Sequence, residues 1–475
     1  MPLPTIPSGN VATATAATGY DVANSCRFND GDSAYLTRDL GTSTAGSGSK
    51  FTFSVWVKRG VLGTDQYLFS GGVAASNHLV DLCFKDDDTL RYRLIYNNTT
   101  YGLLRTDAKF RDPGAWMHIV INMDTTQGTA ADRTSMYVNG TKVTSFSTSD
   151  RPNQNSTFTV NNNTVNSQRK SIGRSEDSSG DHFDGYMAEV VWIDGSTLAA
   201  SSFGEFNEDS PNIWQPVDVS GLTFCTHGFY LDFEASDNLG NDANGGTDLT
   251  ESGLAAQDQT VDTCTNNFAT VNLLDNYKNG STFSEGNCQI VTGGATYSWN
   301  TGTIGLSAGK FYWETELDAE GSGGSALFGI SDRPTISTTE ELGGLATTYA
   351  YLSSGNFRTN NTNTSNSVSA SPGDIIGIAL NLDDNEISYY KNNVLIVAAQ
   401  SITAPASTLN GFYFPAWGDW LDGGSGTVTF KVNFGNPPYA NSSDAADGNG
   451  YGAFEYAPPS GFLAICTKNL GSTGG

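Results

Sequence analysis

Short stretches of alternating apolar and polar residues recur along the chain, and they predict half-buried β-strands. Residues 51–57 (FTFSVWV) and 116–124 (WMHIVINMD) show this pattern, in which successive side chains point to opposite faces of a sheet. Residues 135–143 predict a hairpin, because the Asn139-Gly140 pair at its centre tolerates the positive φ angles of a tight turn. The spacing of such strands and turns predicts a jelly-roll-like sandwich.

The second half of the chain repeats this order of patterns. Residues 375–383 (IIGIALNLD) resemble residues 119–124, since both run apolar and then Asn-apolar-Asp before a turn. Residues 387–396 follow as a second hairpin with Asn392-Asn393 in its turn. We therefore expect an all-β chain of two tandem antiparallel β-sandwiches.

These patterns divide the chain into five parts. We expect an extended arm at residues 1–20, a first sandwich at 21–200, a connector at 201–268 with a strand that completes the first sandwich, a second sandwich at 269–440, and a tail at 441–475 with one edge strand. The arm has no apolar face to bury. It is either a disordered terminus or an attachment peptide for a larger assembly.

Composition supports the fold class and narrows the function. Hydrophobic residues make up 37% of the 475 residues, aromatic residues 11%, and 54 are Gly, which is typical of turn-rich β-proteins. The formal net charge of −26 leaves no cationic footprint for nucleic-acid phosphates. The chain shows no secretory signal at its start and no run of about 18 apolar residues. We expect neither a nucleic-acid partner nor membrane insertion.

Six segments of the second half follow one another in a set order. They are residues 309–314 (GKFYWE), 327–331 (LFGIS), 372–379 (PGDIIGIA), 389–393 (YYKNN), 411–415 (GFYFP) and 432–435 (VNFG). In this order they resemble the strands of SPRY domains, over about 270–440 of the chain. The resemblance implies a β-sandwich that binds its partners through loops at one end.

The first half and the connector carry two further resemblances. Residues 53–58, 116–121, 137–140, 183–186 and 188–190 are similar to laminin-G and concanavalin A-like lectin domains. With residues 212–216, 228–233, 265–270 and 458–461, the whole chain resembles virion structural proteins of tailed phages of marine bacteria. That resemblance implies a fibre, tail or capsid-surface protein, located on the virion surface and released from the host by lysis.

We therefore expect a non-enzymatic virion surface protein that binds host surface carbohydrate or protein. Such a part is expected to be a homo-oligomer, because multivalency strengthens weak contacts, and to contact other virion proteins through residues 1–20. Two alternatives stay open. One is a purely structural decoration or fibre protein without a receptor, and the other is a glycoside hydrolase that acts on host polysaccharide.

Residues 416–422 predict the ligand-binding loop. Trp417, Asp419, Trp420 and Asp422 interleave aromatic rings with carboxylates in this segment. Aromatic faces stack on sugar rings, and carboxylates accept hydrogen bonds from hydroxyl groups. The alternative is that one or both tryptophans pack inside the sandwich or at a subunit interface.

The candidate for the hydrolase alternative is the segment of Glu316, Asp318 and Glu320. It resembles the acidic strand of lectin-like glycoside hydrolases. A flat strand places the Cα atoms of the two Glu residues about 13 Å apart, whereas a retaining pair needs its carboxyl groups about 5 Å apart. We therefore expect these acids on the outer face of a SPRY strand, with Trp313 facing inward.

No cofactor is expected from the sequence. The six cysteines lack a Cys-x-x-Cys spacing, and the histidines, His78, His118, His182 and His227, accompany no nucleophile motif. Ca²⁺ is the one ion considered, because residues 86–88 and 237–242 offer carboxylate and amide oxygens. Neither segment has EF-hand spacing, and turns use Asp and Asn for their own hydrogen bonds.

Overall fold

The computed structural model describes residues 19–40, 46–72, 78–158, 168–177, 181–276, 280–293, 298–322, 324–335, 340–421 and 426–472. These residues form two compact units, divided between Thr265 and Asn266. We call them the N-terminal unit and the C-terminal unit, and describe each by itself. Both consist of antiparallel sheets, which confirms the predicted all-β tandem-sandwich fold. The predicted arm lies outside the described residues except for Gly19 and Tyr20.

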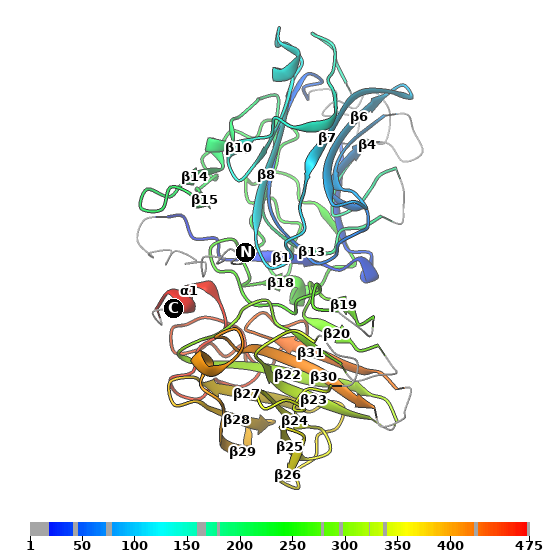
Figure 1. The fold of residues 1–475 in the computed structure, drawn as a ribbon. Coiled ribbons are helices and arrows are strands. Elements are labelled where there is room, and N and C mark those ends of the chain that lie inside the picture. Colours follow the sequence, from blue (N-terminus) through cyan, green and yellow to red (C-terminus); the bar gives the residue numbers. More distant parts are fainter. Residues whose placement is uncertain are drawn as a thin grey trace, which may run out of the picture. The chain divides into compact units, whose positions relative to one another are not determined.

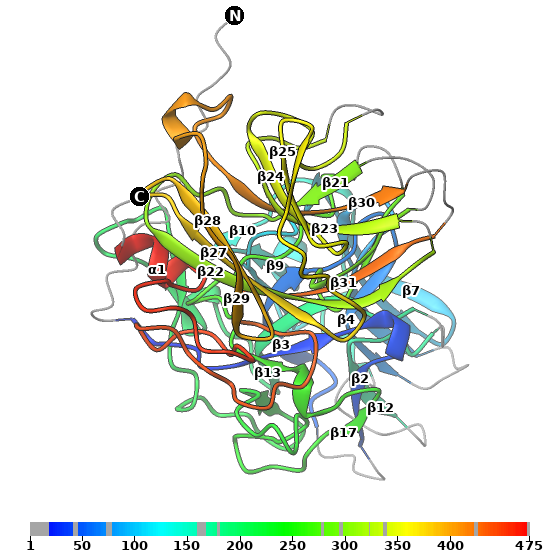
Figure 2. The ribbon, with the colours of Figure 1, turned by 90° about the horizontal axis from the view of Figure 1, so that it is seen from below.

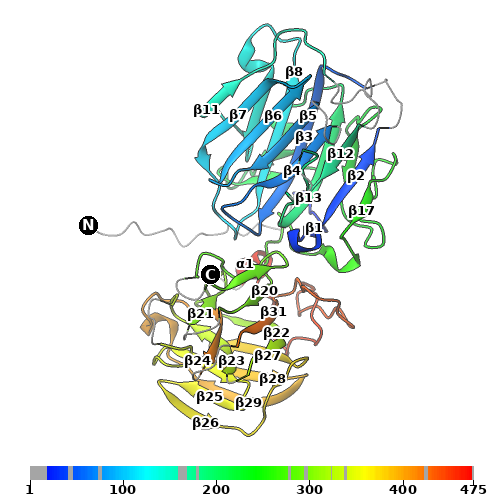
Figure 3. The ribbon, with the colours of Figure 1, turned by 90° about the vertical axis from the view of Figure 1, so that its right-hand side faces the viewer.

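The first sheet of the N-terminal unit (Figure 1) has two ten-residue strands at its centre, β3 and β13, both of which are labelled in Figure 3. Its order is β10-β9-β8-β3-β13-β1-β18, and β16 also pairs with β13. The strands are β1 (Ser25–Phe28), β3 (Lys50–Arg59), β8 (Met117–Asp124), β9 (Thr134–Val138), β10 (Thr141–Lys142), β13 (Gly185–Asp194), β16 (Phe229–Leu231) and β18 (Gln259–Thr260).

The second sheet packs against the first and has the order β11-β7-β6-β5-β4-β12-β2-β17 (Figure 3). Its strands are β2 (Tyr35–Asp39), β4 (Gln66–Gly72), β5 (Leu79–Phe84), β6 (Thr89–Tyr96), β7 (Thr99–Lys109), β11 (Phe146–Asp150), β12 (Arg169–Ile172) and β17 (Thr250–Ser252).

Alternate residues of β3 point between these two sheets. Phe51, Phe53 and Val55 are fully buried there, and the period-two pattern predicted at residues 51–57 is confirmed. Trp192 of β13 stacks on Phe51 with ring centroids 4.7 Å apart. Burying side chains of this size contributes roughly 1.5–3 kcal/mol each, so this aromatic cluster dominates the core.

The Asn-Gly hairpin is also confirmed. Thr141 of β10 pairs with Val138 of β9, and the turn residues Asn139 and Gly140 have φ angles of 45° and 72°. The Asn139 side-chain carbonyl accepts a hydrogen bond of 2.8 Å from the backbone N–H of His118. The turn is therefore fixed to the start of β8.

The connector covers the face of the first sheet that points away from the core. Val120, Val191 and Ile193 project from this face and pack against Phe203 and Phe224. Two short strands, β14 (Gly204–Phe206) and β15 (Trp214–Pro216), pair with each other as a separate two-stranded ribbon. Because both of its faces are covered, β3 is buried at every residue after Lys50, whereas alternation alone predicts a half-buried strand.

The C-terminal unit has a seven-stranded sheet, β19-β20-β31-β22-β27-β28-β29, and a six-stranded sheet, β21-β30-β23-β24-β25-β26 (Figures 1 and 2). The first contains β19 (Thr282–Ser284), β20 (Gln289–Val291), β22 (Lys310–Glu320), β27 (Ile375–Asn381), β28 (Glu386–Lys391), β29 (Val394–Ser401) and β31 (Val428–Asn433). The second contains β21 (Ser298–Thr301), β23 (Gly324–Ser331), β24 (Thr348–Leu352), β25 (Asn356–Thr359), β26 (Thr362–Ser365) and β30 (Phe414–Leu421).

Helical structure is sparse in the described residues. Five 3-10 turns occur, at Asp30–Asp32, Ala130–Asp132, Ala200–Ser202, Ala256–Asp258 and Pro405–Ser407, and one α-helix, α1, spans Thr467–Ser472. No helix of the described residues has the length and apolar character needed to cross a membrane.

The tail of the C-terminal unit is held by a buried carboxylate on β22. Glu314 is fully buried, and its two oxygens accept hydrogen bonds from the backbone N–H groups of Glu455 and Tyr456, at 2.9 and 2.8 Å. Farther along the tail, Leu463 forms an isolated parallel bridge with Phe311. The tail therefore covers the start of β22, a strand in the middle of its sheet.

Both units are expected to lose stability as the pH rises above neutrality. Burial raises the pKa of Glu189 in the N-terminal unit to about 8 and that of Glu314 to about 7. An acid whose pKa is higher in the folded state binds a proton on folding. The free energy of unfolding therefore falls as the pH rises from the ordinary glutamate pKa of 4.5 through these values.

Urea unfolding tests this between about pH 7.5 and pH 8.5, where ordinary histidines, with a pKa of about 6.5, are largely neutral. The midpoints should decrease with pH, and Glu189→Gln should flatten the pH dependence of the N-terminal unit's transition. A slope that is the same in this variant would contradict the assignment to Glu189.

Candidate functional site

The segment predicted as a ligand-binding loop is a strand, so its assignment as a loop is wrong, whereas its role in ligand binding stays a prediction. Residues 414–421 form β30, paired along its length with β23. Trp417 is fully buried between the sheets, where its indole N–H donates a 2.9 Å hydrogen bond to the hydroxyl of Thr315. Its ring meets that of Phe434 edge to face, with centroids 5.7 Å apart. Trp417 therefore packs inside the sandwich, as the alternative interpretation of this segment expected.

The other three predicted residues do not form a shared exposed surface in the described part of the chain. Asp419 is fully buried, and burial raises its pKa to about 6. Trp420 is half-buried, with the Arg358 guanidinium carbon 4.4 Å from its ring centroid. Asp422 lies outside the described residues. Among Trp417, Asp419 and Trp420, only Trp420 is partly exposed.

The three candidate acids of β22 do not act as one group: Glu316 lies opposite Lys431 in the pairing of β22 with β31, next to Asp318, whereas Glu320 is engaged separately. Asp318 pairs with Lys431 at 2.6 Å, and Glu320 accepts a 2.7 Å hydrogen bond from the backbone of Ala326. The pairing of β22 with β31 is irregular between Leu317 and Ala319, which interrupts the simple alternation. Trp313 is fully buried in the core, as predicted.

The acidic loops considered for Ca²⁺ are engaged by protein donors. Asp88 accepts hydrogen bonds from Arg59 at 3.2 Å and Arg111 at 2.8 Å. Asp242 accepts one from the backbone of Tyr230 at 3.0 Å and pairs with Arg38 at 3.5 Å. Within the described part of the chain, no group of three or more His, Cys, Asp or Glu residues is placed to hold a metal ion.

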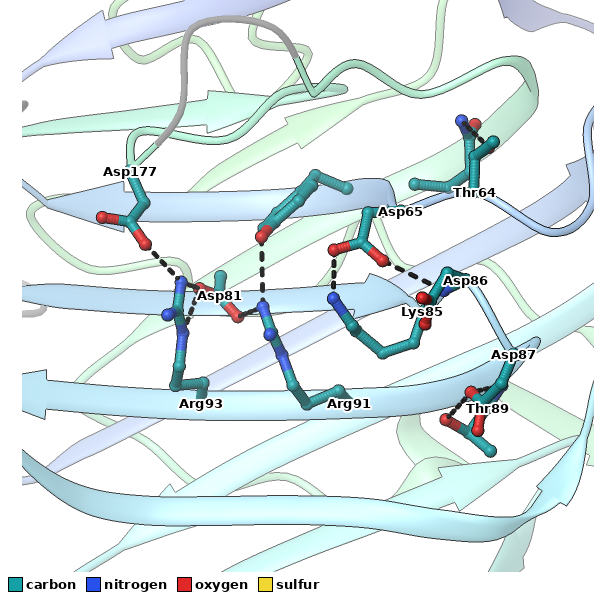
Figure 4. A network of polar contacts seen from close by, with 12 residues as sticks. Thr64, Asp65, Asp81, Lys85, Asp86, Asp87, Thr89, Arg91, Arg93 and Asp177 are labelled. Carbon is teal, nitrogen blue, oxygen red and sulfur yellow. Dashed lines mark hydrogen bonds and ion pairs between the residues drawn. The ribbon is translucent and has the colours of Figure 1, made fainter.

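The outward face of the second sheet carries a network of paired charges (Figure 4). Arg91 and Arg93 of β6 both reach the buried Asp81 of β5, at 3.0 and 2.6 Å, and Arg93 also pairs with Asp177 at 2.9 Å. Lys85 pairs with Asp65 on the same face. Because these charges neutralise one another, the face offers little net attraction to an ionic ligand.

A cavity of about 480 Å³ lies in the N-terminal unit beside the two-stranded ribbon. We call it the aromatic pocket. Its lining residues are Trp56, Trp116, Asn139, Thr141, Phe206, Pro211, Asn212 and Trp214. Four of these eight side chains are aromatic, three are amides or a hydroxyl, and none is charged.

Trp214 is held in the wall of this pocket by close backbone approach and by one hydrogen bond. A Cβ atom on Gly140 would lie 2.3 Å from its ring, and one on Gly204 would lie 2.6 Å from it. The indole N–H donates a 3.0 Å hydrogen bond to Nδ1 of His118. Glycine is therefore required at both positions for the ring to occupy this place.

His118 joins the ribbon to the sheet. Because its Nδ1 accepts from Trp214, its proton is on Nε2, which lies 2.8 Å from the Ser54 hydroxyl. Its ring stacks on Trp56, with centroids 4.8 Å apart. Burial lowers the pKa of His118 to about 3, so the ring is neutral at physiological pH.

The remaining indoles lie on the sheet side of the pocket. The Trp116 N–H donates a 3.0 Å hydrogen bond to Asp262, whose other carboxylate oxygen pairs with Lys58 at 2.8 Å. Trp56 is only 4% exposed, and its indole nitrogen has no acceptor among the described residues. The indole rings are thus fixed in place.

The chemistry of the pocket suits an uncharged ligand with both apolar and hydroxylated faces. Flat aromatic rings pack against an apolar face, and Asn139, Thr141 and Asn212 offer hydrogen bonds around it. No titratable side chain lines the cavity to act as acid, base or nucleophile. The arrangement can bind and orient a ligand, and it contains no groups for catalysis.

Comparisons with known families identify the two domains. The Laminin G 3 family, described as the concanavalin A-like lectin/glucanases superfamily, matches residues 29–201. The SPRY domain family matches residues 310–419. The chain therefore carries a concanavalin A-like domain followed by a SPRY domain, which confirms both domain resemblances and indicates a binding or protein-interaction module.

Two solved structures illustrate what the chain is similar to. The SPRY domain of human HERC1 is 16% identical, covering 33% of this chain and 89% of its own, with a TM-score of 0.25. A native heptameric SAP-like pentraxin from Limulus polyphemus is 15% identical, covering 38% of this chain and 80% of its own, with a TM-score of 0.27. No curated protein matches the chain.

The aromatic pocket is not apparent in the sequence, because its lining comes from distant segments. Trp56 and Trp116 lie within the matched lectin-like region, whereas Phe206 and Trp214 lie beyond its last residue, 201. The available signal was the adjacent pair Ile213-Trp214 in the connector. Half of the pocket is thus built by residues outside the family match.

Adding a methyl group at Gly140 should displace Trp214. Gly140→Ala places a Cβ inside van der Waals distance of the ring and imposes a side chain at a φ of 72°. We expect the N-terminal unit to lose about 1–3 kcal/mol, measured by urea unfolding followed by tryptophan fluorescence. The matched control is Gly245→Ala, which also has a positive φ, of 78°, but where the new Cβ meets nothing within 4 Å. An equal loss of stability in the two variants would contradict the position of the Trp214 ring against Gly140.

Proposed function

We propose that this chain is a non-enzymatic surface-binding protein that recognises carbohydrate through the aromatic pocket. The observation that carries the proposal is the lining of that pocket, with four aromatic side chains, three neutral hydrogen-bonding side chains and no charge. Sugar rings combine apolar C–H faces with hydroxyl rims, and such a lining complements both. The concanavalin A-like match supports the same ligand class.

The setting we propose is the surface of a virion, as a fibre, tail or capsid-surface component that binds the host envelope. The resemblance of the connector and of residues 458–461 to phage virion proteins supports this setting. A homo-oligomer would present several pockets together, and multivalent contact raises avidity without any new contact in the pocket. Electron microscopy of virions labelled with an antibody against the chain tests the location.

Substitution in the pocket should weaken binding to carbohydrate. Trp214→Ala removes an aromatic wall and the hydrogen bond to His118, so we expect at least a tenfold loss of affinity on a glycan array and for whole cells. Trp420→Ala tests the site predicted from Trp417, Asp419, Trp420 and Asp422, and Leu409→Ala controls for loss of an exposed apolar side chain, 65% exposed, elsewhere. Loss of binding in Trp420→Ala alone would assign the function to that other site.

The chain should not cleave the polysaccharide that it binds. The pocket contains no acid, and Asp318 and Glu320 of the acidic strand have separate partners, Lys431 and Ala326. Incubation with host polysaccharide should therefore produce no new reducing ends. Reducing ends that form with the wild type and disappear in Glu316→Gln would instead establish a glycoside hydrolase.

A further inference from the structure

The ribbon of β14 and β15 extends the aromatic pocket beyond its walls. Phe206 lines the pocket and is nevertheless 46% exposed. It is one of the six large apolar residues found exposed in the described chain. An apolar surface that continues out of a pocket marks a place where a bound partner also continues.

The two aromatic rings at this edge form a corner. The rings of Phe206 and Trp214 meet edge to face, with centroids 4.9 Å apart and an interplanar angle of 71°. A single flat ligand ring can lie against one of these faces but not against both. The corner therefore offers two distinct stacking surfaces, one in the pocket wall and one toward the outside.

The volume of the pocket leads to the same conclusion. A cavity of about 480 Å³ falls in the range of about 300–1,000 Å³ that holds drug-sized ligands. A ligand of that size is larger than a single sugar ring. The pocket thus has room for one ring and the linkage to the next.

The charges near the pocket select against an anionic ligand. The lining has no charged residue, and the buried His118 behind it is neutral. The ribbon carries Glu205, and the loop that follows it carries Glu208 and Asp209, all of them exposed. With a chain net charge of −26, these groups repel sulfated, phosphorylated or carboxylated sugars.

From these observations we infer that the aromatic pocket binds an uncharged oligosaccharide of at least two rings, with Phe206 as the platform for the second ring. This rests on the proposed function, which requires only that some carbohydrate binds. One ring stacks inside the pocket against Trp214, and its neighbour stacks on the exposed face of Phe206. Phe206 is then the residue that sets the preference for chain length.

The test is isothermal titration of the full chain with one to four linked units of glucose, galactose, mannose or N-acetylglucosamine. Glucuronate and sulfated galactose oligomers form the anionic arm. We expect affinity to rise by about tenfold from one unit to two in at least one neutral series and to change little afterwards. The anionic oligomers should bind more weakly than neutral oligomers of equal length.

Substitutions at Phe206 test whether this side chain causes the rise in affinity from one sugar unit to two. Phe206→Ala should reduce the affinity for the two-unit sugar to that for one unit, and Phe206→Tyr, which keeps the aromatic face, should restore the step. Leu409→Ala, which removes an exposed apolar side chain in the other unit, should leave it unchanged. Urea unfolding of each variant checks that the fold is intact.

Three results would overturn the inference while leaving the proposed function standing. They are equal affinity for one and two units, an unchanged step in a folded Phe206→Ala variant, and tighter binding of the anionic series. Failure of every sugar to bind would overturn the proposed function together with the inference.

Discussion

The hydrogen bond from Trp214 to His118 is the contact on which the candidate site depends. At 3.0 Å it attaches the two-stranded ribbon of the connector to a buried residue of the first sheet of the N-terminal unit. It requires a neutral imidazole, and burial provides one by lowering the pKa of His118 to about 3. The stack of His118 on Trp56 and the missing Cβ atoms of Gly140 and Gly204 then fix the wall of the pocket.

Burial also determines where charge is found in this acidic protein. Glu314 and Asp81 are buried carboxylates with donors, in the tail and in Arg91 and Arg93, because an unpaired buried charge is costly. Asp419 differs, since neither of its buried carboxylate oxygens has a hydrogen-bond partner among the described residues, and burial raises its pKa to about 6. The aromatic pocket is free of charge in its lining, although the ribbon beside it is acidic. This separation is the basis of the selectivity for neutral ligands that we propose for the pocket.

The sequence predicts the scaffold better than the site, for a physical reason. Alternation at residues 51–57 and the Asn139-Gly140 turn depend on local backbone geometry, and both are confirmed. The pocket depends on distant segments brought together by packing, which no local pattern records. The segment from Trp417 to Trp420 was wrongly predicted as a loop, because its Gly and Asp are typical of loops. Its strand conformation is specified by pairing with β23, which the local sequence does not record.

The most direct test of this account is to follow the indole N–H resonances of all eight tryptophans by NMR while an uncharged oligosaccharide is added. The account predicts that the signals of Trp56, Trp116 and Trp214, which line the pocket, change with ligand concentration. The signals of the four tryptophans in the C-terminal unit should stay in place. Changes confined to Trp420 and to Trp299, which belongs to the hydrophobic cluster that Trp420 packs against, with the pocket signals unmoved, would contradict it.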